Sequence, residues 1–201
     1  VSSTASGNYS IAQGFLSNAT GEASISIGNA SNVTGNQSIG IGVGNQVHGH
    51  NSGAFGDPSV INANASYSVG NNNTLAAGQT GVFALGNDIK TTASNSVFLG
   101  SNTAYTAADS NTTAGITNAT GVISVGNISA NERRRIQGVA EGLVSENSTD
   151  AVTGAQLYNV SKNSVKYFGV NSTLTGNRDG SGAVGVDSIA IGANVTTTNA
   201  Y

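Results

Sequence analysis

The stretch ASISIGNASNVTGNQSIGIGVGNQVHG, residues 23–49, states one pattern twice. In each copy two isoleucines, two positions apart, precede a glycine, which is Gly28 in the first copy and Gly42 in the second. Glycines aligned in this way stand at positions 14, 28, 42, 56 and 70, with a constant period of 14. The next three, Gly86, Gly100 and Gly126, keep this period only loosely, and the long interval before Gly126 indicates an insertion near residues 101–120. A fixed short period predicts a solenoid.

Each repeat holds two short apolar segments. The first precedes the aligned glycine and places two side chains on one face of a strand, because strand side chains alternate. Its pairs are Ile25/Ile27, Ile39/Ile41, Tyr67/Val69, Phe83/Leu85, Val97/Leu99 and Ile123/Val125. The second segment lies five positions after the glycine, at Ala19, Val33, Val47, Ile61 and Leu75. Turns rich in Gly, Asn and Ser join the two strands, so we predict an all-β fold, a parallel β-solenoid.

The isoleucine pairs are expected to face a shared interior. The residues that we assign to the structural core are Ile25, Ile27, Ile39, Ile41, Val69, Leu85, Leu99 and Val125, with Ile136, Val152 and Leu157 in a later segment. About three sizeable apolar side chains per coil bury too little surface to offset the entropy lost by ordering the residues of that coil. We therefore expect further burial between chains, in a homo-oligomer.

The composition excludes several classes of function. Only 8% of the 201 residues are charged, and Cys, Met and Trp are absent. Without cysteine there is no disulfide scaffold, no cysteine-ligated zinc and no cysteine nucleophile. Residues 1–132 contain a single cation, Lys90, which argues against binding to nucleic acid. No apolar run reaches the length of a membrane span, and the chain starts without Met, so we expect an internal segment of a longer protein whose membrane anchor lies elsewhere.

Five repeat segments carry a resemblance to a known family: SIAQG (10–14), SISIGN (24–29), SIGIG (38–42), NSVFLGSN (95–102) and DSIAIGAN (187–194). They resemble the head repeats of trimeric autotransporter adhesins. The later segment NERRRIQGVAEGLVSENSTDAVTGAQLYNV (131–160) resembles the neck of the same family. The resemblance implies a left-handed parallel β-roll, three chains wound about one axis, and a neck that passes each chain to its neighbour.

The resemblance also implies a division of the chain. Residues 1–126 correspond to the head, 127–160 to the neck, 161–186 to a connector and 187–201 to the start of a second head. From the residues alone, Thr149 or Asp150 is a candidate cap for a short helix through Ala151 to about Ser161. Three arginines, Arg133, Arg134 and Arg135, are expected to pair across chains with Glu132, Glu141, Glu146 or Asp150.

We find no plausible catalytic set, metal site or cofactor site. His48 and His50 flank one turn, and two histidines need further ligands to hold a metal ion. The acidic residues Asp57, Asp88 and Asp109 belong to different coils, which disfavours an enzyme that cleaves polysaccharides.

The leading hypothesis is the exposed head of a bacterial outer-membrane adhesin, with no enzymatic activity. Its partners would be host matrix, host cells or other bacteria, held by many shallow contacts whose avidity offsets weak single sites. The candidate adhesive residues are Asn95, Ser96, Ser101, Asn102, Asp187, Ser188 and Asn194. A passive spacer within an adhesin fibre is the first alternative, and a polysaccharide-acting solenoid is a weaker one.

Overall fold

The computed structural model describes residues 2–105, 120–163, 182–185, 189–192 and 194–197. The chain divides into two compact units, Val1–Arg135 and Ile136–Tyr201, and each is treated by itself below. Of the connector expected at 161–186 the structure describes residues 161–163 and 182–185, and of the second head expected at 187–201 it describes residues 189–192 and 194–197. Residues 106–119 of the insertion lie outside the described residues.

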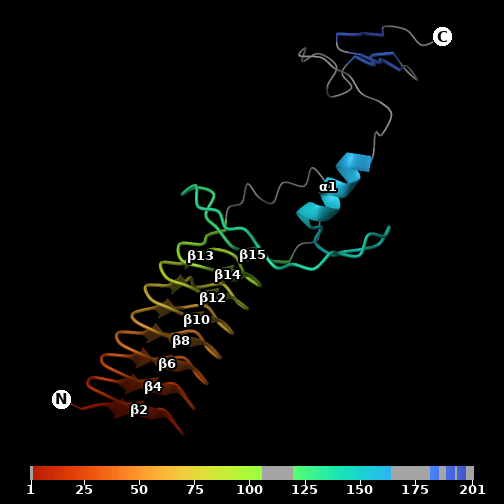
Figure 1. Ribbon diagram of the computed structural model, residues 1–201. Coiled ribbons are helices and arrows are strands. Elements are labelled where there is room, and N and C mark those ends of the chain that lie inside the picture. Colours follow the sequence, from red (N-terminus) through yellow and green to blue (C-terminus); the bar gives the residue numbers. More distant parts are fainter. Residues whose placement is uncertain (1, 106–119, 164–181, 186–188, 193, 198–201) are drawn as a thin grey trace. The chain divides into compact units, whose positions relative to one another are not determined.

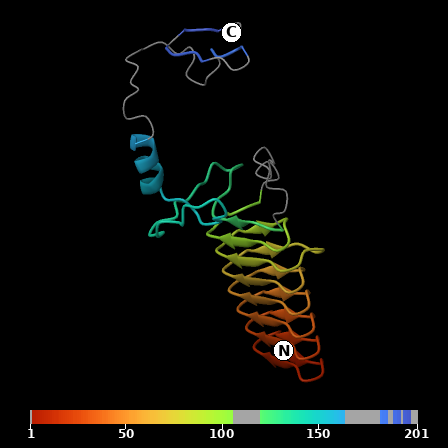
Figure 2. The same ribbon diagram turned by 90° about the vertical axis from the view of Figure 1, so that its right-hand side faces the viewer.

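The first unit is a stack of coils, each contributing one strand to each of two sheets (Figure 1). The strands of one sheet lie side by side along the whole stack in both views (Figure 2). The seven-stranded sheet, called sheet A here, has the order β1 (Thr4–Ala5), β3 (Asn18–Ala19), β5 (Asn32–Val33), β7 (Gln46–Val47), β9 (Val60–Ile61), β11 (Thr74–Leu75) and β13 (Lys90–Thr91). The eight-stranded sheet, sheet B, runs from β2 (Ile11–Gln13) through β4 (Ile25–Ile27), β6 (Ile39–Ile41), β8 (Gly53–Phe55), β10 (Tyr67–Val69), β12 (Phe83–Leu85) and β14 (Val97–Leu99) to β15 (Ile123–Ser124).

All pairing in the two sheets is parallel, and its register follows the sequence period. Ile25 pairs with Ile39, and Val33 pairs with Val47, so each residue meets its equivalent in the next repeat. The register widens between Tyr67 and Phe83 and again between β14 and Ile123, where the glycine spacing also widens. The parallel β-solenoid predicted from the sequence is confirmed.

The interior of the coil is narrow and largely filled by small side chains. From sheet B it receives the middle residue of each triplet, such as Ser26, Ala54 and Phe98, all fully buried. From sheet A it receives the predicted second set, Ala19, Val33, Val47, Ile61 and Leu75, which are 0% exposed. These residues confirm the second apolar segment of each repeat.

Polar side chains line the corners of the interior and bind from coil to coil. The Ser38 hydroxyl donates to the carbonyl of Gly49 at 2.8 Å and accepts the backbone N–H of Ser52 at 3.1 Å. At the other corner Asn45 donates to the Gly56 carbonyl at 2.6 Å and accepts the N–H of Ser59 at 2.9 Å. Buried polar groups are costly unless they are paired, and among the described residues every buried side-chain nitrogen and oxygen has a partner.

The aligned glycines are needed because adjacent coils touch at this corner. Gly28 has a φ of +127°, and a Cβ there would lie 1.9 Å from the carbonyl oxygen of Gly42 in the next coil. Only glycine combines this backbone angle with such a close approach. The repeated glycine therefore sets the spacing at which coils stack.

The second unit contains one helix, α1 (Gly154–Asn163), in the part that is described. Thr153 is its N-cap: the Thr153 hydroxyl accepts the N–H of Gln156 at 3.3 Å, while the Gln156 side chain accepts the N–H of Thr153 at 3.1 Å. This reciprocal pair is a capping box. The expected cap at Thr149 or Asp150 was therefore wrong, because Thr153 and Gln156 have the spacing that satisfies two free N–H groups at once.

Candidate functional site: the outer faces and the end of the coil stack

The outer face of sheet B is apolar. In each triplet the residues on either side of the buried middle one point out of the coil, so large side chains are left partly uncovered. Phe83 and Leu85 are about half exposed, at 51% and 52%. The other exposed large residues of this face are Ile11, Ile41, Phe55, Val69, Leu99 and Ile123. They form a continuous row, because every strand of sheet B pairs in register with the next.

Aromatic packing fills part of this row. The rings of Tyr67 and Phe83, on adjacent strands, lie 5.4 Å apart between centroids at an interplanar angle of 31°. The Tyr67 ring also lies over Gly53, where a Cβ would come within 2.8 Å of it. A row of this length on the outside of a coil is the kind of apolar surface that marks an interaction site.

The expectation that the isoleucine pairs face the interior needs correction for the single chain. Ile25, Ile27 and Ile39 are half-buried, and so is Val125. The remaining members assigned to the core are exposed: Ile41, Val69, Leu85, Leu99, Ile136, Val152 and Leu157. The physical reason is strand alternation: the two outer residues of a triplet share one face and the middle residue takes the other, and here the middle residue faces the interior. The single chain therefore gives these residues no fully buried interior.

The outer face of sheet A is polar. Asn18 donates its side-chain amide to the amide oxygen of Asn32 at 2.8 Å, and Asn32 donates to that of Gln46 at 3.0 Å. The hydroxyl of Thr34 lies 2.9 Å from Nδ1 of His48 in the next coil. This face therefore satisfies much of its hydrogen bonding along the stack.

The residues proposed for adhesion lie in unlike places. Asn95 and Ser101 are exposed at turns, and Asn102 is half-buried with its amide donating to Glu132 at 3.0 Å. Ser96 is fully buried and its hydroxyl accepts the N–H of Val122, so it has no surface to offer a ligand. In the second unit Asn194 is exposed, whereas Asp187 and Ser188 lie outside the described residues.

The two histidines take part in the contacts between coils. Nδ1 of His50 accepts the backbone N–H of Asn36 at 3.0 Å, and the N–H of His50 donates to the Asn64 side chain at 2.9 Å. His50 thus fills the same position as Asn36 and Asn64 in neighbouring coils. Over the described residues no group of three or more His, Asp or Glu is placed to hold a metal ion.

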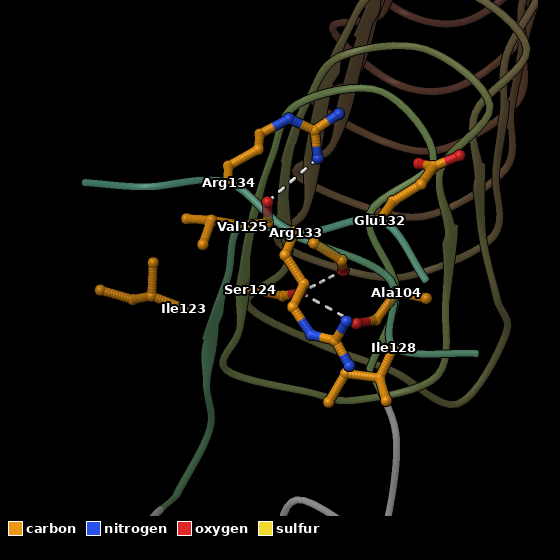
Figure 3. Close-up of a pocket in the computed structure, with 9 residues that line it drawn as sticks. Ala104, Ile123, Ser124, Val125, Ile128, Glu132, Arg133 and Arg134 are labelled. Carbon is orange, nitrogen blue, oxygen red and sulfur yellow. Dashed lines mark hydrogen bonds between the residues drawn. The ribbon is translucent and has the colours of Figure 1, made fainter. Parts of the chain in front are cut away.

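The end of the coil stack is closed by Arg134, which the sequence did not single out from its two neighbours. Its guanidinium donates to the carbonyl of Val125 at 3.0 Å (Figure 3). It also donates to the carbonyl of Ser101 at 2.8 Å. It lies against Gly100, where a Cβ would be 2.8 Å from the guanidinium carbon. In earlier coils this place beside the glycine belongs to the glycine of the next coil. Arg134 thus ends the stack in place of another coil.

A pocket of about 310 Å³ lies beside this closure, lined by Ala104, Ile123, Ser124, Val125, Gly126, Ile128, Glu132, Arg133 and Arg134 (Figure 3). Arg133 donates to the side chain of Asn131 at 2.6 Å. The pairing of the arginines with acidic residues across chains stays a prediction.

In the second unit, the segment before α1 is fastened to the start of the helix. The Gln156 amide donates to the carbonyl of Gly142 at 2.6 Å and its oxygen accepts the N–H of Gly142 at 3.0 Å. The carboxylate of Asp150 accepts the N–H of Leu143 at 2.9 Å. The apolar residues Leu143, Val152 and Leu157 stay about two-thirds exposed, so this unit also displays an uncovered apolar surface. No helix in the described part of the chain is long and apolar enough to cross a membrane.

Comparisons with known proteins agree with this architecture. Residues 135–180 match the family model described as the coiled stalk of trimeric autotransporter adhesin. The fold is similar to the crystal structure of the collagen-binding domain of the Yersinia adhesin YadA, with a TM-score of 0.54 and 23% identity over 80% of this chain and 86% of that one. No curated protein matches the chain. The stalk match and the shared fold together confirm the resemblance to the trimeric autotransporter adhesins.

Proposed function

We propose that the chain forms a homotrimeric adhesin segment in which the apolar outer face of sheet B is buried between chains. The observation that carries this proposal is the row of half-exposed residues that includes Phe83 and Leu85. Burying such side chains stabilises an assembly by about 25 cal/mol per Å² of apolar surface. A closed assembly about one axis would cover the row in all copies alike.

In such an assembly the polar face of sheet A and the turns remain for a ligand. We infer that they bind host matrix, host cells or other bacteria, at the outer surface of a bacterium with an outer membrane. Three identical chains and repeated coils would multiply weak contacts into useful avidity. Collagen is the first ligand to test, since the similar YadA domain is collagen-binding. Resemblance to adhesins, whose role is structural, supports a protein without enzymatic activity.

The test is retention of the purified segment on immobilised collagen, fibronectin and laminin, and on whole bacteria. Saturable retention on one of them is expected, with no retention on albumin. If none retains a segment of verified trimeric mass, the segment is not the adhesive part.

A passive spacer is the second candidate, and one observation favours it for the first coils. The amides of Asn18 and Asn32 already bind along the stack, which leaves them fewer groups for a ligand. Replacing these coils, residues 1–56, by an unrelated spacer of equal length distinguishes an adhesive role from a spacer role. Unchanged binding to cells would assign residues 1–56 to spacing.

The division of the chain proposed from the sequence, into a head, a neck from residue 127, a connector and a second head, has support at its far end. Ala183 pairs in parallel with Thr197, at the same sequence separation as paired strands early in the first unit. Gly192 has a φ of +116° and Asn194 one of +59°, the same succession as at Gly28 and Ala30 and in most other coils of the first unit. A second coil stack beginning here would account for both.

A further inference from the structure

A polar pocket of about 280 Å³ lies near the end of the first unit, apart from the apolar row. Its side chains come from three coils and from the segment that follows them: Asn72, Asp88, Lys90, Asn102, Thr103 and Asn127. A volume near the lower limit of ligand sites, about 300 Å³, suits one small polar molecule.

The pocket is a local departure from the repeat. The second residue after each aligned glycine is Leu16, Ala30, Gly44 or Pro58 in the first four coils, and Asn72, Asp88 or Asn102 in the last three. Leu16 and Ala30 adopt the same left-handed backbone, with φ of 55° and 54°, as Asp88 with 58°. The turn therefore forms without these polar side chains, and backbone geometry alone does not account for them.

Lys90 departs from its own series as well. The equivalent outward residues of sheet A are Thr4, Asn18, Asn32, Gln46, Val60 and Thr74, all uncharged. Lys90 is exposed, and it is the sole Lys or Arg among residues 1–132. Within the described residues its ammonium forms no ion pair, even though Asp88 lines the same pocket.

The other groups of the pocket are partly engaged. Asn72 donates to one carboxylate oxygen of Asp88 at 2.7 Å, and Asn127 donates to the side chain of Asn102 at 3.4 Å. These bonds hold the side chains in place and leave the second carboxylate oxygen of Asp88 able to accept. Asn102 also donates to the carboxylate of Glu132 at 3.0 Å, and Asn127 accepts the N–H of Ala130 at 3.1 Å. Over the described residues the pocket thus combines a cation outside any ion pair, a carboxylate oxygen without a hydrogen bond and amides that keep part of their bonding capacity.

We propose that this pocket binds a carboxylated sugar. The ammonium of Lys90 holds the carboxylate of the sugar, and the free oxygen of Asp88 accepts a hydroxyl proton. The second N–H of the Asn102 amide and that of the Asn127 amide can donate to further hydroxyls. This inference rests on the proposed adhesive role and deepens it by naming a ligand class.

Two sources share this chemistry, namely sialic acid at the ends of host glycans and uronic acid in polysaccharides. The experiment is saturation-transfer NMR on the whole segment with N-acetylneuraminic acid, glucuronic acid and neutral galactose, each up to about 10 mM because single sugars bind weakly. Binding of either acid, with at least tenfold weaker binding of galactose, is expected. The preferred acid identifies the source.

The variants are Lys90→Gln, which removes the cation, and Asp88→Asn, which keeps a side chain suited to the left-handed backbone. Lys90→Gln should weaken binding of the acid about tenfold or more, equivalent to the loss of one charged contact. Asp88→Asn keeps an acceptor oxygen and should weaken binding less than Lys90→Gln does. Lys162→Gln in α1 is the matched control and should leave binding unchanged. Unaltered circular dichroism and mass show that the variants are folded.

Absence of transfer to both acids, equal transfer to galactose, or indifference to Lys90→Gln would each overturn the inference. Retention on the matrix coatings is scored on the same samples. If the segment still binds matrix but binds no acidic sugar, the proposal for this pocket is wrong and the proposed adhesive function stands.

Discussion

Sheets A and B wind through the same coils and share one interior, yet their outer faces differ in chemistry. Sheet B displays a row of branched and aromatic side chains, including Val69 and Leu85 at 42% and 52% exposure. Sheet A displays amides and hydroxyls that bind one another, as Asn32 and Gln46 do. The difference teaches that the interior takes only the middle residue of each sheet B triplet, so the large residues on either side of it are left for contacts beyond the coil.

The sharpest way to break this comparison is to shorten one aromatic residue inside the coil and one outside it. Phe98 is fully buried, so Phe98→Ala should lower the free energy of unfolding by about 3–5 kcal/mol. Phe83→Ala removes a ring that is 51% exposed in the single chain and should cost clearly less under conditions that keep chains apart. Denaturant unfolding of both variants at low protein concentration measures the difference. Equal losses of unfolding free energy would mean that Phe83 is as well buried as Phe98 in the separated chain.

A second prediction concerns the end of the stack, where both sheets lose their next coil. Arg134→Gln removes two charge-assisted hydrogen bonds to the carbonyls of Ser101 and Val125, and we expect a loss of about 1 kcal/mol given the exposure of the side chain. Amide exchange should accelerate in β14 and β15 and stay unchanged in β4 and β6. Arg133→Gln is the control, because Arg133 binds only the Asn131 side chain among the hydrogen bonds described. Equal rates of amide exchange in β14 and β15 for the two variants would mean that Arg134 does not close the end of the stack.

The smallest effect is expected on the polar face. Asn32→Ala removes two side-chain hydrogen bonds, one with Asn18 and one with Gln46. Because the Asn32 side chain is half-exposed, water can take its place, and the free energy of unfolding should fall by about 0.5–1 kcal/mol. The number of chains in the assembly of the Asn32→Ala variant should not change. Thermal unfolding and sedimentation check both points. A change in mass would place sheet A, instead of sheet B, between chains.

The sequence predicts the coils well because one steric requirement repeats. Glycine at 28 and 42 is readable as a contact between coils, and Val33 and Val47 mark the second strand without ambiguity. The sequence predicts less well which residues of sheet B face the interior. Alternation places Ile25 and Ile27 on the same face, but it does not say whether that face is the inner or the outer one. The clue was Ser26 between them, a residue small enough for the interior.

Other features depend on competition that a linear reading does not resolve. Thr149, Asp150 and Thr153 are all competent helix caps, and only Thr153 has Gln156 three positions on to complete a capping box. Arg134 sits between two identical residues, so its role depends on where the stack ends. Ser96 shares its turn with the exposed Asn95 but points inward as the corner serine of its coil.

The most direct test of the central claim is the solution mass of the segment by light scattering, alongside Leu85→Asp on the apolar face and Thr74→Asp on the neighbouring strand of the polar face. We predict three times the chain mass of 19.9 kDa for the unaltered segment and for Thr74→Asp, and weakened or lost assembly for Leu85→Asp. A charge on Leu85 would have to be buried without a partner in the assembly. A stable folded monomer, or a trimer indifferent to Leu85→Asp, would contradict the burial of sheet B between chains.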